Sequence, residues 1–234
     1  LGRMLATAAA EIGMRTHVFC PDPQSPAFEV TPHKTVAAYE DRDALARFSE
    51  NVDIVTYEFE NVPVDTAEFL SGLRPLAPGA VALRVAQDRL EEKAFLTGAG
   101  IEVAPFAAVA SRDQLTAALE RIGAPAVLKT TRLGYDGKGQ RTIRSAADAE
   151  AAFDAIGGTQ LVLEAFILFE REISVIVARS ATGEIAAYDP AENVHRAHTL
   201  KTSTVPANHH ADTAALATAR ARRIVAALES VPGA

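Results

Sequence analysis

The sequence predicts an α/β domain followed by an α+β domain with an antiparallel sheet. In the first part, a strand-like run at residues 15–20 and a continuous apolar run at 52–57 lie among helical patterns, which is typical of an open parallel sheet. In the second part, several strand-like runs follow one another directly, which favours an antiparallel sheet. We place the N-terminal α/β domain at residues 1–84 and a bridging helix and strand at 85–110.

The first domain opens inside a helical pattern at residues 1–14, and the run Arg15–Cys20 follows it as a strand. A helix before the first strand indicates that an earlier strand is missing, so we expect the N-terminal end to be incomplete. The run "VDIVTY", residues 52–57, is expected to be a buried parallel strand, and "TAEFLSGL" a helix. The segment "AQDRLEEKAFLTGAG", residues 86–100, is expected to be one bridging helix.

The second domain begins with the strand "VAPFAAV" and a helix at residues 111–123 that Ser111 caps. Further strands are expected at residues 124–131, 140–145, 159–167, 171–180 and 185–190, with a helix at 146–157 and a turn at "TGE". Residues 198–207 read as extended and 212–230 as a helix. The basic run "RARRIV" in that helix is most simply its exposed face.

The composition limits the class of protein. The 234 residues carry a net charge of −7, whereas binding to a phosphate backbone needs a basic surface, so we expect no nucleic-acid partner. Cys20 is the only cysteine, which excludes an intrachain disulfide and suits a reducing cytoplasm. No apolar run approaches the length of a membrane span. These features favour a cytoplasmic protein that does not bind a membrane.

A glycine-rich loop lies between two apolar runs, in "TTRLGYDGKGQRTI", residues 130–143. Gly134, Gly137 and Gly139 allow backbone amides to approach a ligand closely, as in loops that bind phosphate. Lys129 ends the preceding strand and adds an ammonium group. The spacing matches neither a Walker motif nor a dinucleotide fingerprint, and a solvated hairpin is the alternative interpretation.

Two glutamates mark the ends of neighbouring strands. Glu164 closes an apolar strand and Glu172 opens the next one, where a carboxylate and backbone groups can bind ribose and an adenine edge. A solvated strand end is the alternative. His195, His198, His209 and His210 could suggest a metal cluster, but their spacing does not enforce convergence, so solvated imidazoles are favoured over a structural metal.

Several motifs together resemble the ATP-grasp superfamily, and more closely the 5-(carboxyamino)imidazole ribonucleotide synthase family. They are "LGRMLATAA", "TYEFENVP", "QDRLEEKAFL", "GYDGKGQ" and "AENVHRAHTLKTSTVPA", and they cover almost the whole chain. The resemblance implies an ATP-grasp fold preceded by a pre-ATP-grasp domain with an open parallel sheet, both ends being incomplete. It implies a lid subdomain at residues 111–190 and the beginning of the C-terminal ATP-grasp core at 191–234.

The resemblance also assigns roles to single residues. It implies Arg89 and Lys129 as cations on the ATP phosphates, and the backbone of Gly134, Gly137, Gly139 and Gln140 as the lid over them. It implies Glu164, Ile167 and Glu172 as adenine and ribose contacts, and His195 as a further ATP-site residue. Tyr135, Asp136 and Lys138 would face aminoimidazole ribonucleotide, with Asp136 as the catalytic residue near its amine and Lys138 near its phosphate; Glu60 is a weaker substrate-side candidate.

The implied activity is an ATP-dependent carboxylation in purine biosynthesis. ATP and bicarbonate give carboxyphosphate, and the amine of aminoimidazole ribonucleotide captures the carboxyl group, with ADP and phosphate as products. The resemblance implies Mg²⁺, with ligands beyond residue 234, and a homodimer. The alternatives are a formate-dependent glycinamide ribonucleotide transformylase, which is a related ATP-grasp enzyme, and a nucleotide-binding module without its catalytic C-terminal part.

Overall fold

The computed structural model describes residues 1–134, 137–157, 160–196, 199–208 and 211–229. The chain folds into two compact units, one that ends at Gln87 and one that begins at Asp88. Within the described ranges, no helix combines the length and the apolar character that a membrane span requires.

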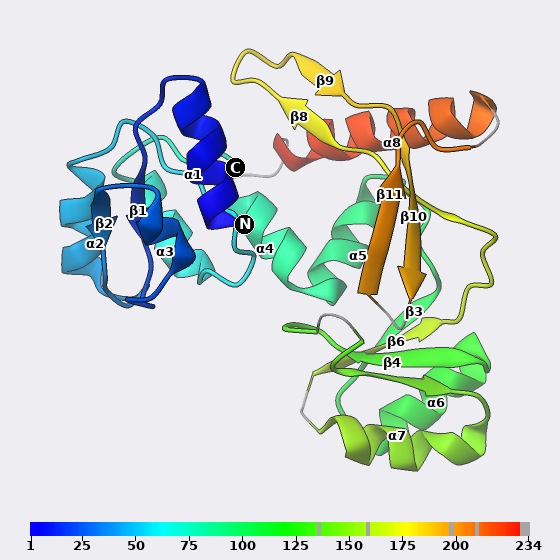
Figure 1. The fold of residues 1–234 in the computed structure, drawn as a ribbon. Helices are drawn as coiled ribbons and strands as arrows, with labels where there is room; N and C mark the ends of the chain where they lie inside the picture. Colours follow the sequence, from blue (N-terminus) through cyan, green and yellow to red (C-terminus); the bar gives the residue numbers. More distant parts are fainter. Residues whose placement is uncertain (135–136, 158–159, 197–198, 209–210, 230–234) are drawn as a thin grey trace. The chain divides into compact units, whose positions relative to one another are not determined.

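The first unit combines a small parallel sheet with helices (Figure 1). Strands β1 (His17–Phe19) and β2 (His33–Thr35) pair in parallel, as the predicted α/β class requires. The helices are α1 (Gly2–Glu11), the short 3₁₀ helix η1 (Pro26–Glu29), α2 (Arg42–Ser49), α3 (Val64–Ser71) and α4 (Ala80–Gln87). The core is formed by Leu45, Phe48, Val55, Ala67, Leu70, Ala80 and Leu83.

The prediction of a strand at residues 52–57 is wrong. Of these residues only Val55 pairs, in a single parallel bridge with Leu76. The Val55 N–H donates to the Pro75 carbonyl at 2.8 Å, and the Ala77 N–H donates to the Val55 carbonyl at 3.0 Å. Extension toward Asp53 would need a donor at Pro75, which has no N–H. The apolar run is therefore buried at Val55 without forming a ladder.

The second unit contains a four-stranded antiparallel sheet with the order β3-β6-β4-β5. The strands are β3 (Phe106–Val109), β4 (Ala126–Thr130), β5 (Gln140–Ile143) and β6 (Leu161–Ala165). Strand β3 falls in the predicted bridging segment, yet it pairs with β6 and is part of this sheet. Helices α6 (Arg112–Ile122) and α7 (Ala149–Ile156) cover one face, with the 3₁₀ helix η2 (Ala146–Asp148) before α7 (Figure 1). The predicted Ser111 cap is confirmed, since its side chain accepts a hydrogen bond from the Gln114 N–H.

The two faces of this sheet differ in character. Leu128 and Leu163 are fully buried against α6 and α7, in a core completed by Ala107, Val109, Leu115, Ala118, Leu119, Ala126, Ile143, Ala149, Ala152 and Leu161. Because successive side chains of a strand point to opposite faces, Lys129 and Glu164 lie on the face away from these helices. We call it the open face.

The single bridging helix predicted at residues 86–100 is also wrong. Helix α4 ends at Gln87, and α5 (Arg89–Gly98) begins after Asp88, which has an extended backbone. The Asp88 carboxylate accepts hydrogen bonds from the N–H groups of Leu90 at 2.8 Å and Glu91 at 3.3 Å. The chain therefore starts a new, side-chain-capped helix in the middle of a continuous helical pattern.

The strand predicted at residues 171–180 divides into two strands that belong to different sheets. Strand β7 (Glu172–Ser174) pairs with β10 (Ala191–Arg196), which also pairs with β11 (Thr199–Thr204). Strand β8 (Val177–Arg179) instead forms a hairpin with β9 (Ile185–Ala187) across the predicted "TGE" turn, where Gly183 has a φ of +89°. The final helix, α8 (Ala211–Glu229), lies against this hairpin, because Arg222 donates to the Ile185 carbonyl at 3.1 Å (Figure 1).

Candidate functional site

The open face carries an ion pair between two of the predicted site residues. Lys129 on β4 and Glu164 on β6 are 35 residues apart in the chain, and their register places Glu164 opposite Val127, diagonally beside Lys129. The Lys129 Nζ lies 2.9 Å from Glu164 Oε2. The Glu164 side chain is only 11% exposed, so the loss of its cationic partners would leave a buried, unpaired carboxylate.

Helix α5 supplies a second cation, Lys93, which the sequence analysis did not identify. Its Nζ lies 3.3 Å from Glu164 Oε1 and 5.6 Å from the centre of the Phe106 ring. Phe106 stands directly opposite Glu164 in the pairing of β3 with β6. A sequence signal existed, because Lys93 follows Arg89 by four residues and therefore lies on the same face of the helix.

A second carboxylate lies near this cluster. Glu92 is an exposed residue overall, but its pKa is raised, mainly because neighbouring groups partly desolvate the carboxylate and to a lesser degree because of the charge of Glu164. Lys93, Arg89 and Lys129 act in the opposite direction and hold this pKa down. Among the described residues, the cluster therefore contains three cations and two carboxylates, which gives these five side chains one positive charge in excess when all are ionised.

Arg89 connects α5 to the glycine-rich loop. Its guanidinium donates hydrogen bonds to the carbonyl oxygens of Thr130 at 2.8 Å and Gly134 at 2.9 Å. Its own N–H donates to the Thr131 carbonyl at 2.9 Å. The side chain therefore anchors the beginning of the loop, and its predicted contact with phosphate remains a prediction.

The glycine-rich loop closes tightly on Thr130. The Thr130 N–H donates to the Gly139 carbonyl at 2.9 Å, and Gly137 and Gly139 have φ values of +78° and +69°. A Cβ atom at Gly139 would lie 2.8 Å from Thr130 Oγ1, and one at Gly134 would lie 3.2 Å from it. Glycine is therefore required at Gly139 by both backbone conformation and space.

The remaining loop residues have different positions. Lys138 is exposed in a turn, and Gln140 begins β5 opposite Lys129. Tyr135 and Asp136, the predicted substrate-side residues, lie outside the described residues. Glu60 is exposed in a turn of the first unit, and its predicted role remains a prediction.

The predicted adenine and ribose contacts follow β6. Ile167 is 50% exposed in the connection to β7, which is rich in exposed apolar side chains. Glu172 begins β7, and its Oε1 lies 3.5 Å from the Nδ1 of His195 on β10. Strand pairing therefore brings Glu172 and His195 together.

Asn193, which was not predicted, links the side chains around Glu172. Its Nδ2 donates to Ser174 Oγ at 3.0 Å and to Glu172 Oε1 at 3.5 Å, and its Oδ1 accepts a hydrogen bond from Ser203 Oγ at 2.8 Å. Asn193 could have been found from the sequence, because it stands two residues before His195 and a strand places two such side chains on the same face.

A metal site is not formed by the described part of the chain. No group of three or more histidine, cysteine, aspartate or glutamate side chains there could hold a metal ion. His198, His209 and His210 lie outside the described residues. The described residues therefore do not identify ligands for Mg²⁺.

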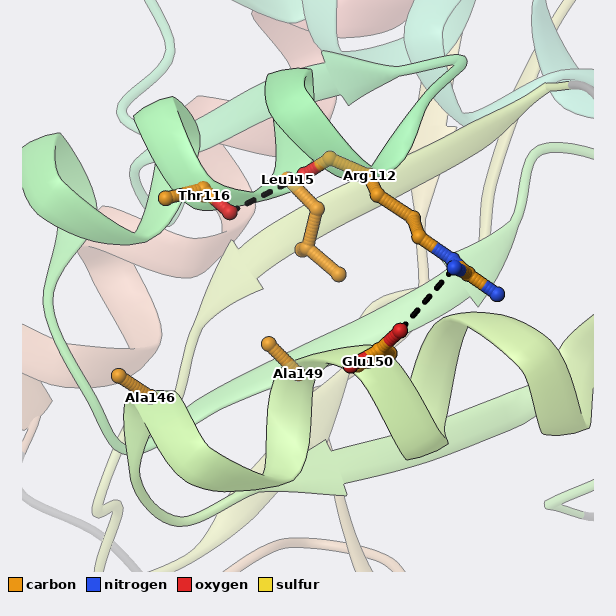
Figure 2. A pocket seen from close by; sticks show the side chains of 6 residues that line it. All are labelled: Arg112, Leu115, Thr116, Ala146, Ala149 and Glu150. Carbon is orange, nitrogen blue, oxygen red and sulfur yellow. Dashed lines mark hydrogen bonds and ion pairs between the residues drawn. The ribbon is translucent and has the colours of Figure 1, made fainter.

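A pocket also lies between α6 and α7, on the helical side of the four-stranded sheet. It is lined by Arg112, Leu115, Thr116, Ala146, Ala149 and Glu150. Figure 2 shows Arg112 turned across it toward Glu150, and the two side chains form an ion pair at 3.0 Å. Arg112 also pairs with Asp154 at 2.6 Å, so its charge is already neutralised by protein carboxylates. The open face is therefore the better candidate for a ligand site.

The open face and its loop fit the polyphosphate of a nucleotide. Arg89, Lys93 and Lys129 supply positive charge, and the glycines let backbone amides come close. Among the described side chains, Thr130 Oγ1 is a buried polar atom without a hydrogen-bond partner, and it lies under this loop. A buried hydroxyl without a hydrogen-bond partner is costly.

The fold and this site define a protein of the ATP-grasp type. Residues 94–232 match the ATP-grasp domain, and residues 1–87 match the ribonucleotide synthetase preATP-grasp domain. The chain therefore belongs to the ATP-grasp family, and the fold class predicted from the sequence is confirmed.

Similar proteins include several N5-carboxyaminoimidazole ribonucleotide synthases. The enzyme of that name from Brucella melitensis biotype 1 is 46% identical over 99% of this chain and 64% of its own length. A crystal structure of the ADP complex of N5-carboxyaminoimidazole ribonucleotide synthetase is 39% identical, with a TM-score of 0.93 over 98% of this chain and 61% of that one.

A third similar protein is the Aspergillus clavatus N5-carboxyaminoimidazole synthase in complex with ADP and 5-aminoimidazole ribonucleotide. It is 26% identical, with a TM-score of 0.88 over 97% of this chain and 60% of that one. The chain thus spans less than two thirds of the length of each of these three proteins.

Proposed function

We propose that the protein uses ATP to carboxylate 5-aminoimidazole ribonucleotide with bicarbonate, giving 5-(carboxyamino)imidazole ribonucleotide, ADP and phosphate in purine biosynthesis. The observation that carries the proposal is the 46% identity to a synthase of this name over 99% of the chain. The open face supports it, because its cations and its glycine-rich loop suit a triphosphate.

In this proposal the residues of the open face bind and orient ATP. Lys129 and Arg89 stabilise the negative charge of the phosphates, and the backbone of Gly134, Gly137, Gly139 and Gln140 closes over them. Glu164, Ile167, Glu172 and His195 hold adenine and ribose. Closure excludes water, which protects a labile carboxyphosphate from hydrolysis.

The ribonucleotide lies on the other side of the loop in this proposal. Asp136 accepts a hydrogen bond from its amine and orients that nitrogen, Lys138 pairs with its phosphate, and Tyr135 adds a further contact. Glu60 of the first unit stays a weaker substrate-side candidate. We further propose that ATP enters with Mg²⁺, that the protein is a homodimer and that it acts in the cytoplasm. The single Cys20 suits that compartment.

An ATPase assay on the purified protein tests the reaction. We expect ADP release that depends on both 5-aminoimidazole ribonucleotide and bicarbonate. Release that instead depends on glycinamide ribonucleotide and formate would favour the related transformylase. Tight ATP binding without turnover on either pair would favour a nucleotide-binding module.

Two loop variants test the substrate side. Asp136→Asn keeps the size of the side chain but removes its charge, so product formation should fall by about 100-fold while ATP affinity is retained. Lys138→Ala should instead raise the KM for the ribonucleotide, because it removes a contact present before and during the reaction. Parent-like kinetics of both variants would contradict the assignment of this loop to the ribonucleotide.

A further inference from the structure

Glu164 is shared between two lysines, one on each of its oxygens. Oε2 lies 2.9 Å from Lys129 Nζ, and Oε1 lies 3.3 Å from Lys93 Nζ. Removing every cationic partner from a buried carboxylate is strongly unfavourable. At least one of these two ion pairs must therefore persist as long as Glu164 stays charged and buried.

The two lysines differ in how freely they can leave Glu164. The Lys93 side chain is 12% exposed, and its ammonium is held from a second direction by the Phe106 ring. The Lys129 side chain is 25% exposed, and only Thr130 separates it from the residues of the glycine-rich loop. Lys129 is therefore the lysine that can turn toward a ligand under the loop.

We infer that Lys93 is a positioning residue, which retains Glu164 while Lys129 exchanges this carboxylate for the phosphates of a bound nucleotide. The inference rests on the ATP binding proposed above. Without nucleotide, both lysines neutralise Glu164. When a triphosphate binds, Lys129 turns to the phosphate oxygens, and Lys93 alone keeps Glu164 charged and in place on the open face.

The proposed exchange predicts that loss of Lys93 weakens the binding of ligands with phosphates but not of a nucleoside. A purely structural role of Lys93 would not produce this difference. Without Lys93, moving Lys129 to a phosphate leaves Glu164 unpaired, whereas a nucleoside without phosphates leaves Lys129 where it is. Lys93→Met, which keeps an apolar stem beside Phe106, should therefore weaken binding of a non-hydrolysable ATP analogue by about 10-fold or more. Adenosine affinity should change by less than about 2-fold. Isothermal titration calorimetry measures both ligands, and Lys93→Arg should restore most of the analogue affinity.

A double-mutant cycle with Glu164→Gln isolates the proposed interaction. In the Glu164→Gln background no carboxylate remains to be neutralised, so adding Lys93→Met should change analogue affinity by less than about 2-fold. In this double variant no buried carboxylate is left without a cationic partner, so it separates the loss of Lys93 from the burial of an unpaired Glu164. An equal effect of Lys93→Met on both ligands and in both backgrounds would overturn the inference.

Lys34 provides a matched control. It is an exposed lysine of the first unit whose Nζ lies 5.5 Å from the Phe28 ring, close to the 5.6 Å between Lys93 and Phe106. Lys34→Met should bind both ligands like the parent. A parent protein that does not bind the analogue would overturn the proposed function and this inference with it. A parent that binds it, combined with a parent-like Lys93→Met, would overturn the inference alone.

Discussion

Arg89 and Gly134 are joined by a hydrogen bond of 2.9 Å from the guanidinium to the backbone carbonyl oxygen, across 45 residues of chain. The bond ties the first residues of α5 to the first glycine of the loop. The same guanidinium also holds the Thr130 carbonyl at the end of β4. Loop conformation and helix position are thereby coupled through one side chain.

Replacing Arg89 with methionine should loosen the glycine-rich loop even without a ligand. The change removes two hydrogen bonds from a charged donor, together worth about 3 to 6 kcal/mol, while keeping an apolar stem. Amide hydrogen exchange of the loop should accelerate in the ligand-free protein. Arg121→Met is the control, because Arg121 also donates to a backbone carbonyl, that of Phe106 at 3.2 Å, away from the loop. Unchanged loop exchange in Arg89→Met would contradict the anchoring role.

Gly139→Ala should destabilise the protein by about 1 to 3 kcal/mol, because the added Cβ meets a neighbouring atom and the backbone conformation disfavours a side chain. The conflict is with Thr130 Oγ1, 2.8 Å from the Cβ position, at a φ of +69°. Thr130→Ala should therefore recover part of the loss in the double variant. Chemical denaturation measures each free energy of unfolding.

Gly98→Ala is the matched control for this substitution. Gly98 is the last residue of α5, and a Cβ there would have no atom within 4 Å. Alanine should leave stability unchanged or raise it by up to about 1 kcal/mol. Equal destabilisation at Gly98 and Gly139 would show that the close approach to Thr130 is not the cause.

His17 should make the stability of the first unit depend on pH. Burial, and then the nearby charge of His33, lowers the pKa of His17 from its ordinary value of 6.5. The folded state thus binds fewer protons than the unfolded state, so its stability is fully present above the unfolded pKa and falls as the pH drops through the window below it.

The comparison variant is His17→Gln, which retains a partner for Thr35 Oγ1, 2.9 Å from His17 Nε2. Between about pH 8 and pH 5, the parent should lose more unfolding free energy than His17→Gln. Denaturant titrations at each pH measure this difference. Parallel pH profiles of the two proteins would rule out His17 as the cause.

Lys129→Met should weaken ATP binding by about 1.5 to 3 kcal/mol, the contribution of a charge-assisted hydrogen bond. The fold should survive, because Lys93 still pairs with Glu164 at 3.3 Å. Calorimetric titration with ATP provides the affinity, and thermal unfolding provides the control for folding. Parent-like affinity would remove Lys129 from the phosphate site.

Local signals predicted most single elements of this protein. Ser111 stands before a helical pattern, and its side chain caps α6 as expected, because capping involves only neighbouring residues. The turn at Gly183 was equally local. Two of the wrong predictions had distant causes: Pro75 has no N–H to extend a ladder from Val55 toward Asp53, and β10 and β9 divide residues 171–180 between two sheets. The single helix predicted at residues 86–100 failed for a local reason, because the Asp88 side chain caps a new helix.

The candidate site was predictable in its residue types but not in its pairings. The loop glycines and Lys129 are adjacent in the chain, so they were found together. The contact of Lys129 with Glu164 depends on the register of β4 with β6, and the contact of Lys93 depends on where α5 packs. Neither can be read from local periodicity, which reports the face of an element and not its neighbour.

Strand β6, "LVLEA", contributes both to the core and to the open face, because its successive side chains point to opposite faces of the sheet. Its odd-numbered residues Leu161 and Leu163 fill the core, and its even-numbered residues include Glu164 on the open face. One residue inserted ahead of Leu161 would exchange the two sets of side chains and turn the Glu164 carboxylate toward the leucines of the core. An insertion of two residues would leave each side chain on its original face. Substitutions at Leu161, Val162 or Leu163, all of them buried, should therefore act on stability, whereas substitutions at Glu164 should act on the ion pairs of the open face.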